Sequence, residues 1–428
     1  MNQDSTSPAR SPSYKWWVVF MLWFVCLFNY ADRQAISAVF PVLEAEFGFS
    51  KFELGLIGSA FMWVYALGGP FAGYVGDRVR RKDLILGGCL FWSVVTMMTG
   101  WCGRLWQFVT VRALEGFGET FYFPASMSLM SDYHGPESRS RALAFHQSSV
   151  YAGTIAGSWL GAWIAEHYGW RLGFYAFGGG GIILALILFT FLREPRRGES
   201  EGLVEGPPEP PMSWREVAQA LLRSPTAPLL MAAFLAANFV ATIFLTWTPT
   251  FLVEKFGYKL AAAGLSGSVF IQLASAVGSP LGGIFADRLG SRWTGGRIVI
   301  QALGLLSGAL CVFLVGTAAD VPSLIGSMVL FGLCKGFYDS NIFASLYDTV
   351  EPRARATAAG LMNTVGWGGG ALGPVFVGWV ATNGRHPTEV ENMSEAIASC
   401  GLAYLAGAVL LILAVASLRR DRGRSKGV

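Results

Sequence analysis

Charged residues occur near the start of the chain inside a segment that is otherwise apolar. Asp32 and Arg33 follow Asn29 and Tyr30 there, in the run that begins at Trp16. The apolar stretch before Asn29 is too short to cross a membrane, which takes about 20 residues. We therefore expect the charged pair inside a membrane span. Charged side chains at that depth are costly and usually functional, because a carboxylate there can carry a proton and an arginine can hold an anion.

A second charged cluster lies in the apolar segment 105–131. Arg112, Glu115 and Glu119 are spaced so that they share one face of a helix. An arginine with two carboxylates can form an ion pair, a proton site or an anchor for an anion. The alternative is a structural network that neutralises itself, and Glu115, one turn from Arg112, fits that alternative better than Glu119 does.

A third group of polar residues, Lys335, Asp339 and Asn341, lies in the segment 322–347. Lys335 and Asp339 could complete a site for an anion or a zwitterion. They are also spaced to pair with each other along one helix, and the sequence does not separate these two readings.

Single polar residues inside other apolar runs are further candidates: Asn238, Gln272 and Asn363. Such residues commonly serve as hydrogen bonds between helices. Aromatic residues that could line a cavity are Trp63, Tyr65, Tyr122, Tyr151, Trp247, Tyr338 and Trp367.

The composition indicates that lipid is the solvent for the elements that carry these residues. The chain has 428 residues, of which 53% are hydrophobic and 14% charged, whereas soluble domains have about 25% charged residues. Apolar runs long enough to span a membrane occur near 16–41, 52–76, 83–101, 105–131, 141–166, 170–192, 226–253, 262–286, 296–318, 322–347, 356–381 and 396–417. These twelve runs predict an all-α membrane protein.

Several classes of function are disfavoured by the same sequence. The 6 cysteines and 4 histidines show no spacing typical of metal ligands or disulfides. We find no nucleotide-binding G-x-x-x-x-G-K-[ST] run and no pairing of nucleophile and base on one face. We expect no enzyme activity, no cofactor, no metal and no nucleic-acid partner.

Basic residues predict the orientation. Most of the 32 lysines and arginines fall in loops on one side of the membrane, together with both termini, which indicates a cytoplasmic location for that side. A proline-rich linker divides the spans into two sets of six, and its part near 213–223 has the spacing of an amphipathic helix. The predicted organisation is an N-terminal tail (1–15), a six-helix bundle (16–192), a linker (193–225), a second bundle (226–417) and a C-terminal tail (418–428).

The two sets of spans repeat a loop motif. Gly73, Asp77 and Arg78, with Arg81, have a weaker counterpart in Gly283, Asp287 and Arg288 at one constant offset. This G-x-x-x-D-R pattern resembles the cytoplasmic loop 2–3 of the major facilitator superfamily, and the resemblance covers essentially the whole chain. We expect these residues to form a charge latch between the two halves that breaks and re-forms during gating. The alternative is a basic loop that only sets the topology.

The charged motifs resemble two branches of that superfamily. Asn29-Tyr-x-Asp32-Arg33 together with Arg112-x6-Glu119 is similar to the anion:cation symporters, which carry sugar acids and related carboxylates. That resemblance implies proton coupling at Asp32 and Glu119 and binding of a substrate carboxylate by Arg33 and Arg112. The segments around Lys335 and Asn363 resemble instead the spinster-like branch, which is linked to lysolipids.

The sequence therefore predicts a monomeric transporter of the plasma (bacterial inner) membrane, working by alternating access between two bundles. Proton-coupled uptake of a small organic anion is our first interpretation, a spinster-like exporter of amphipathic solutes the second, and a membrane sensor without transport the third. The predicted partners are a small-molecule solute, protons and the lipid bilayer. The predicted solute-binding residues are Asn29, Tyr30, Arg33, Arg112, Asn238, Gln272, Lys335, Asp339, Asn341 and Asn363.

Overall fold

The computed structural model describes residues 13–76, 78–135, 137–195, 221, 225–293, 295–350 and 355–425. All regular secondary structure in these ranges is α-helical. The first half contains α1 (Tyr14–Ala38), α2 (Phe40–Phe47), α3 (Lys51–Gly76), α4 (Arg81–Thr99), α5 (Leu105–Glu119), α6 (Tyr122–Tyr133), α7 (Arg139–Tyr168) and α8 (Trp170–Phe191). The second half contains α10 (Thr226–Phe256), α11 (Leu260–Arg292), α12 (Gly296–Thr317), α13 (Val321–Asp339), α14 (Ile342–Tyr347), α15 (Arg355–Asn383), α16 (Glu389–Ser399) and α17 (Gly401–Ser425).

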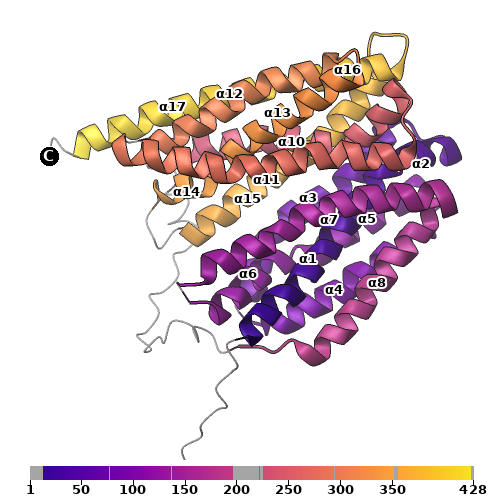
Figure 1. The fold of residues 1–428 in the computed structure, drawn as a ribbon, viewed down its shortest axis with the longest axis horizontal. Coiled ribbons are helices and arrows are strands. Elements are labelled where there is room, and N and C mark those ends of the chain that lie inside the picture. Colours follow the sequence, from indigo (N-terminus) through magenta and orange to yellow (C-terminus); the bar gives the residue numbers. More distant parts are fainter. Residues whose placement is uncertain are drawn as a thin grey trace, which may run out of the picture.

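The helices gather in two groups, α1–α8 and α10–α17, that lie side by side (Figure 1). We call the end of the molecule where α1 begins and α17 ends the terminal face, and the opposite end, which carries α2 and α16, the distal face. The linker segment near 213–223, which the sequence predicts as an amphipathic helix, lies outside the described residues except for Leu221.

The helices are consistent with the predicted twelve spans. Within the described residues, 9 helices or helix pairs are long and apolar enough to cross a membrane. The other predicted spans correspond to α5 with α6, to α7 and to α15, which are rich in small and polar residues. Large apolar side chains such as Leu67, Phe71 and Leu310 are exposed on the protein, as expected where lipid takes the place of water.

Four predicted spans are divided in two. The segment predicted as one helix over 16–41 breaks at Val39, between α1 and α2. The segment predicted as one helix over 105–131 breaks at Thr120, between α5 and α6. Pro124 contributes to the break because it has no N–H to offer the carbonyl of Thr120. The segment over 322–347 likewise breaks between α13 and α14, and the last predicted span becomes α16 and α17. The sequence-based prediction of continuous helices was wrong at these points.

Glycines bring the helices of the first half close together. Gly153, Gly157 and Gly161 form a stripe along α7 that faces α1. A Cβ atom at Gly153 would lie 2.5 Å from the carbonyl oxygen of Leu27, and one at Gly157 would overlap the backbone at Ala31. This spacing is the small-residue packing typical of membrane helices, and it fixes the part of α1 that carries Asp32 and Arg33.

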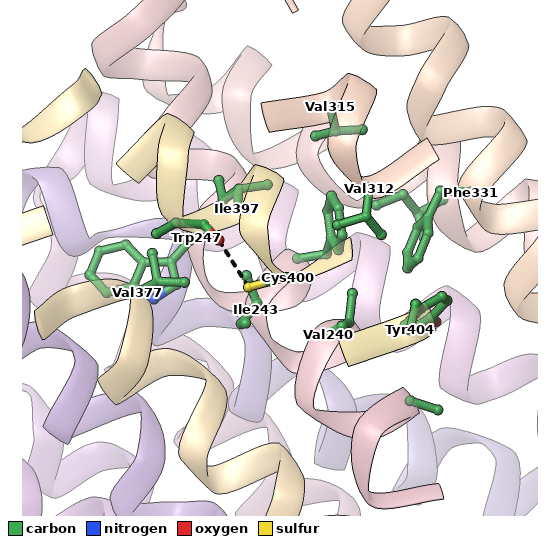
Figure 2. Packing of buried hydrophobic residues seen from close by; sticks show 14 of the residues in the cluster. Val240, Ile243, Trp247, Val312, Val315, Phe331, Val377, Ile397, Cys400 and Tyr404 are labelled. Carbon is green, nitrogen blue, oxygen red and sulfur yellow. Dashed lines mark hydrogen bonds between the residues drawn. The ribbon is translucent and has the colours of Figure 1, made fainter. Parts of the chain in front are cut away.

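The core of the second half is made of interlocking aromatic and branched side chains (Figure 2). Phe244 of α10 stacks on Phe331 of α13 with ring centroids 4.4 Å apart. The indole of Trp247 donates a hydrogen bond of 3.1 Å to the carbonyl oxygen of Pro374 in α15. These contacts hold α10, α13 and α15 together as one unit.

Candidate solute and proton site

An ion pair between α1 and α5 forms the centre of the candidate site. The Arg33 guanidinium donates through Nη2 to Glu119 Oε2 at 2.6 Å and through Nε to the same oxygen at 3.2 Å. It also donates to Asn29 Oδ1 at 3.4 Å. Arg33 and Glu119 are both buried. The structure thus brings together the two charged motifs that the sequence places 86 residues apart.

Arg112 and Glu115 form a second buried pair directly beside the first. Arg112 Nη1 lies 2.5 Å from Glu115 Oε2, and Arg112 Nη2 donates to the Arg33 carbonyl oxygen at 3.4 Å. The structural pairing that the spacing allowed for Arg112 and Glu115 is therefore formed. Arg112 donates a hydrogen bond to the backbone of α1, and its ion-pair partner, Glu115, lies on the same helix as Arg112.

Asp32 is fully buried in α1 and has few polar contacts. Thr96 of α4 donates to Asp32 Oδ2 at 3.4 Å, and Oδ1 has no hydrogen-bond partner among the described residues. The cluster contains three buried carboxyl groups, those of Asp32, Glu115 and Glu119, and two buried guanidinium groups. If all five were ionised, the buried cluster would carry one excess negative charge, which is unfavourable in a low-dielectric interior.

Four aromatic rings surround the Arg33 guanidinium. Its Cζ atom lies 4.6 Å from the ring centroid of Tyr30, 4.5 Å from that of Phe61 and 5.0 Å from that of Tyr65. Trp367 of α15 supplies the fourth ring, at 5.2 Å. Aromatic faces stabilise a cation by their quadrupole. Trp367 is the member of this cage that comes from the second half of the chain.

A small cavity of about 80 Å³ lies between the two halves next to the cage. Its wall is formed by Tyr65, Thr120 and Phe123 from the first half and by Asn363 and Trp367 from the second, with other residues. Asn363 is thus the one predicted solute-binding residue of the second half that the described structure places on this cavity wall.

The other predicted binding residues of the second half are engaged locally. Lys335 pairs with Asp339 one turn further along α13. Asn341 donates to the Phe337 carbonyl oxygen at 3.1 Å, and Asn238 to that of Phe234 at 3.0 Å. Gln272 is buried in α11. The described structure shows no hydrogen bond or ion pair from this group to Arg33 or Glu119.

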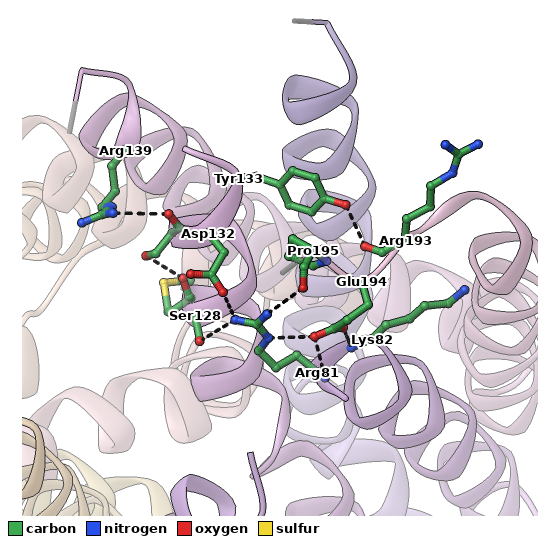
Figure 3. A network of polar contacts seen from close by, with 11 residues as sticks. Arg81, Lys82, Ser128, Asp132, Tyr133, Arg139, Arg193, Glu194 and Pro195 are labelled. Carbon is green, nitrogen blue, oxygen red and sulfur yellow. Dashed lines mark hydrogen bonds and ion pairs between the residues drawn. The ribbon is translucent and has the colours of Figure 1, made fainter. Parts of the chain in front are cut away.

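Charges near the terminal face pair within each half. Arg81 binds Asp132, Glu194 and Ser128, with 2.9 Å to Glu194 Oε1 and 3.1 Å to Ser128 Oγ (Figure 3). In the second half Arg297 binds Asp348 at 2.9 Å and Asp287 at 2.8 Å.

The latch between the halves stays a prediction, although two of its charged residues pair elsewhere. Arg81 and Asp287 instead have partners within their own half that neutralise them. Arg78 and Arg288 have exposed side chains, and Gly283 borders open space. Asp77 lies outside the described residues, and of Gly73 only the helical backbone is described.

Polar contacts between the two halves are concentrated toward the distal face. Lys51, which is buried at the start of α3, pairs with Glu44 of α2 and with Glu254 of α10 in the other half. The Ala261 N–H donates to Glu166 Oε2 at 2.8 Å.

Further cross-half hydrogen bonds also lie toward this face. The Phe52 N–H donates to Thr382 Oγ1 at 3.2 Å, and Ser158 Oγ donates to the Gly264 carbonyl oxygen at 2.7 Å. Gln34 of α1 donates to the Leu245 carbonyl oxygen of α10. These cross-half hydrogen bonds all involve residues toward the distal face.

These observations define a class of protein: a multi-pass helical membrane protein with a buried charged cluster in its first half and a small cavity between the first and second halves. A family model described as Major Facilitator Superfamily matches residues 22–374 and 267–428. The chain belongs to the major facilitator superfamily.

Known proteins from two branches are similar to it. A probable galactarate/D-glucarate transporter, GudP of Bacillus subtilis (strain 168), is 30% identical over 434 residues and covers 94% of this chain and 93% of its own length. Protein spinster homolog 1 of Homo sapiens is 33% identical over 252 residues, covering 58% of this chain and 47% of its own length. The family is one of transporters, which are not enzymes.

The fold is also similar to a solved structure. The crystal structure of a bacterial homolog to the human lysosomal transporter Spinster, in an inward-facing and unoccupied conformation, superposes with a TM-score of 0.77. It is 23% identical in sequence, and the match covers 95% of this chain and 97% of that one. This likeness concerns the fold.

Two contributors to the site were missed by the sequence analysis. Phe61 stacks on both Arg33 and Arg112, at 4.5 and 5.0 Å from the guanidinium carbons, and Thr96 donates to Asp32. A phenylalanine and a threonine in apolar runs carry no signal of their own. Tyr65 and Trp367 were candidates for a cavity wall, and the structure places them together there.

Proposed function

We propose that this transporter couples the uptake of a small organic anion, a sugar acid or related carboxylate, to protons by alternating access. The excess of one buried carboxyl group over the two arginines carries the proposal. A cluster that cannot be neutral without a proton is suited to take one up and release it. The full-length similarity to a probable galactarate/D-glucarate transporter supports the choice of solute.

Asp32 and Glu119 are the proposed proton carriers. Glu119 holds Arg33 when it is ionised, and protonation would remove that charge. Asp32 has a free carboxyl oxygen and a single threonine donor among its described partners, so it has the least compensation for a negative charge. A proton on either residue would neutralise the cluster.

Arg33 is the proposed anchor for the solute carboxylate. When Glu119 is protonated, the Arg33 guanidinium can bind the carboxylate of a solute in the adjoining cavity instead of Glu119. An arginine can donate two parallel hydrogen bonds to such a carboxylate. Asn29, Tyr30 and Asn363 would add hydrogen bonds to a polyhydroxylated solute. Arg112 acts in this scheme by holding Glu115 and the α1 backbone next to Arg33.

The concentration of cross-half contacts toward the distal face supports a state open toward the terminal face. We infer that the terminal face is cytoplasmic, because most basic loop residues lie there, and that the protein works as a monomer in a bacterial inner membrane. Opening of the distal side would then require separation of Lys51 from Glu254.

A second candidate function is export of a lysolipid or another amphipathic solute. The aromatic cage around Arg33 and the apolar members of the cavity wall, Phe123 and Trp367, favour it. An amphipathic solute would bind its anionic head at Arg33 and its apolar part against these rings.

Transport in proteoliposomes tests the two candidates. Galactarate or D-glucarate should accumulate when a pH gradient is imposed, and Glu119→Gln should abolish accumulation while leaving exchange at equal pH. Glu137→Gln is the control, because Glu137 is exposed outside the cluster. Gradient-driven accumulation by Glu119→Gln would refute proton coupling through this residue. Transport of lysolipid without any response to sugar acids would favour the second candidate.

A further inference from the structure

A groove of about 510 Å³ runs along the outside of the first half, between α1 and α8 near the terminal face. On α1 its wall is formed by Tyr14, Trp17, Met21 and Phe24, with Phe20 beside them. On α8 it is formed by Leu184, Ile187, Leu188 and Phe191, with Thr190. The repeats of three and four residues show that each helix presents one continuous face.

The groove has a closed end and an open end. Toward the middle of the helices the ring of Phe28 reaches α8 so closely that a Cβ atom at Gly180 would lie 2.8 Å from it. The groove begins beyond this contact and extends along both helices to Arg193. Trp17, Ile187 and Phe191 are exposed on the protein. In a chain that spans a membrane, this face lies against lipid.

A positive charge is fixed at the open end. The Arg193 backbone is held on both sides, because its N–H donates to Tyr14 Oη at 3.0 Å and its carbonyl oxygen accepts from Tyr133 at 2.8 Å. The guanidinium lies 5.6 Å from the Tyr14 ring centroid. Figure 3 shows this side chain directed away from the Arg81 cluster.

No carboxylate pairs with Arg193 in the part of the chain that the structure describes. The neighbouring Glu194 binds Arg81 at 2.9 Å and the Lys82 N–H at 2.8 Å. The groove therefore combines an apolar trough with a guanidinium at its mouth that has no carboxylate partner among the described residues. Tyr14 and Trp17 lie next to that cation, which is the arrangement of aromatic and basic residues found at the headgroup level of a membrane.

We propose that this groove binds an anionic phospholipid from the leaflet at the terminal face, with one acyl chain along the groove and the phosphate at Arg193. An apolar trough alone would accept any lipid. The charge at its mouth selects a headgroup with net negative charge over a zwitterionic one. The site lies on the outer surface of the first half, away from the Arg33 cluster, and does not depend on the transported solute.

Native mass spectrometry of the full chain in detergent tests this proposal, with phosphatidylglycerol and phosphatidylcholine added in turn. Wild-type protein should retain phosphatidylglycerol preferentially. Ile187→Trp fills the groove and should lower its occupancy about tenfold or more, an effect of 1.4 kcal/mol or above. Ile183→Trp is the matched control, because Ile183 is exposed on α8 outside the groove. Equal melting temperatures would show that both variants fold.

The charge is tested separately. Arg193→Ala should weaken phosphatidylglycerol binding about fivefold, the contribution of one basic residue at an anionic surface, and leave phosphatidylcholine unchanged. Arg141→Ala serves as the control for an exposed arginine near the same face. Unchanged phosphatidylglycerol occupancy in Ile187→Trp would overturn the site. Equal loss of both lipids in Arg193→Ala would overturn its selectivity for anionic lipid.

Discussion

Replacing Glu254 with glutamine should shift the protein toward the conformation in which the two halves are separated at the distal face. Glu254 of α10 is the cross-half partner of the buried Lys51 ammonium, and Glu44 is its partner within the first half. The substitution keeps the shape and leaves Lys51 paired with Glu44, so it removes one charge-assisted contact without leaving an unpaired buried charge. Such contacts contribute about 1.5–3 kcal/mol. Because glutamine retains a weaker hydrogen bond, we take the lower value.

A loss of about 1.5 kcal/mol in the distally closed state shifts the equilibrium toward the distally open state roughly tenfold. Double electron–electron resonance between spin labels on the two halves would measure this shift. Cysteines introduced at Gly103 and Ala319 would carry the labels on exposed distal loops. Cys334 would be replaced by alanine, because it is the native cysteine that is not fully buried among those described.

The expected result is a new population at longer distance in Glu254→Gln. Glu53→Gln is the matched control, since Glu53 accepts hydrogen bonds from Ser50 within the first half and makes no described contact across the halves. A distance distribution identical to that of the wild type would show that the Lys51–Glu254 contact does not hold the distal face closed.

Three other predictions concern single positions. Gly157→Leu should destabilise the protein by about 1–3 kcal/mol, because the α1 backbone occupies the required space; thermal melting in detergent would show no change if the helices can separate freely. Trp367→Leu should weaken solute binding without abolishing proton-driven transport, because it removes one of four rings around the Arg33 guanidinium; unchanged affinity in a binding assay would remove Trp367 from the site. Arg171 and then Trp170 hydrogen-bond Glu46 and lower its pKa; the resulting stabilisation is present above the normal pKa of glutamate and lost as the pH falls through the lowered pKa. The Arg171–Glu46 pair is partly exposed, so its contribution is about 0.2–1 kcal/mol. The melting temperature of Glu46→Gln should therefore approach that of the wild type in acid. A constant difference at all pH values would contradict this account.

Most of the fold follows from the sequence because lipid imposes simple rules. Long apolar runs predicted the helices, and the repeated Asp-Arg loop predicted two similar halves. The breaks at Thr120 and between α13 and α14 could not be placed this way. A helix can break only where a neighbouring helix or side chain donates a hydrogen bond to the freed backbone carbonyl groups. The hydropathy of a segment does not show where such donors lie.

The charged part of the site was predictable and its surroundings were not. Charge inside an apolar run is rare enough to identify Asp32, Arg33 and Glu119. The pairing partners were left open, and the structure joins Arg33 to Glu119 and Arg112 to Glu115. Phe61 could not be found from the sequence, because its importance comes from the position of its ring and not from its type.

The three residues that we expect to bind a proton or the solute carboxylate, Asp32, Glu119 and Arg33, all belong to the first half, as does Arg112, which holds Glu115 beside them. A rigid rotation of one half against the other would therefore leave every ionic contact among them at the same distance. The rotation alone would therefore not change the ionic interactions that determine how tightly Asp32 and Glu119 bind a proton. The rotation would change only contacts that join the two halves. The indole of Trp367 makes such a contact, because it belongs to α15 and lies over the Arg33 guanidinium. The first half would then bind the proton and the solute carboxylate, and the second half would respond to the state of that site through Trp367.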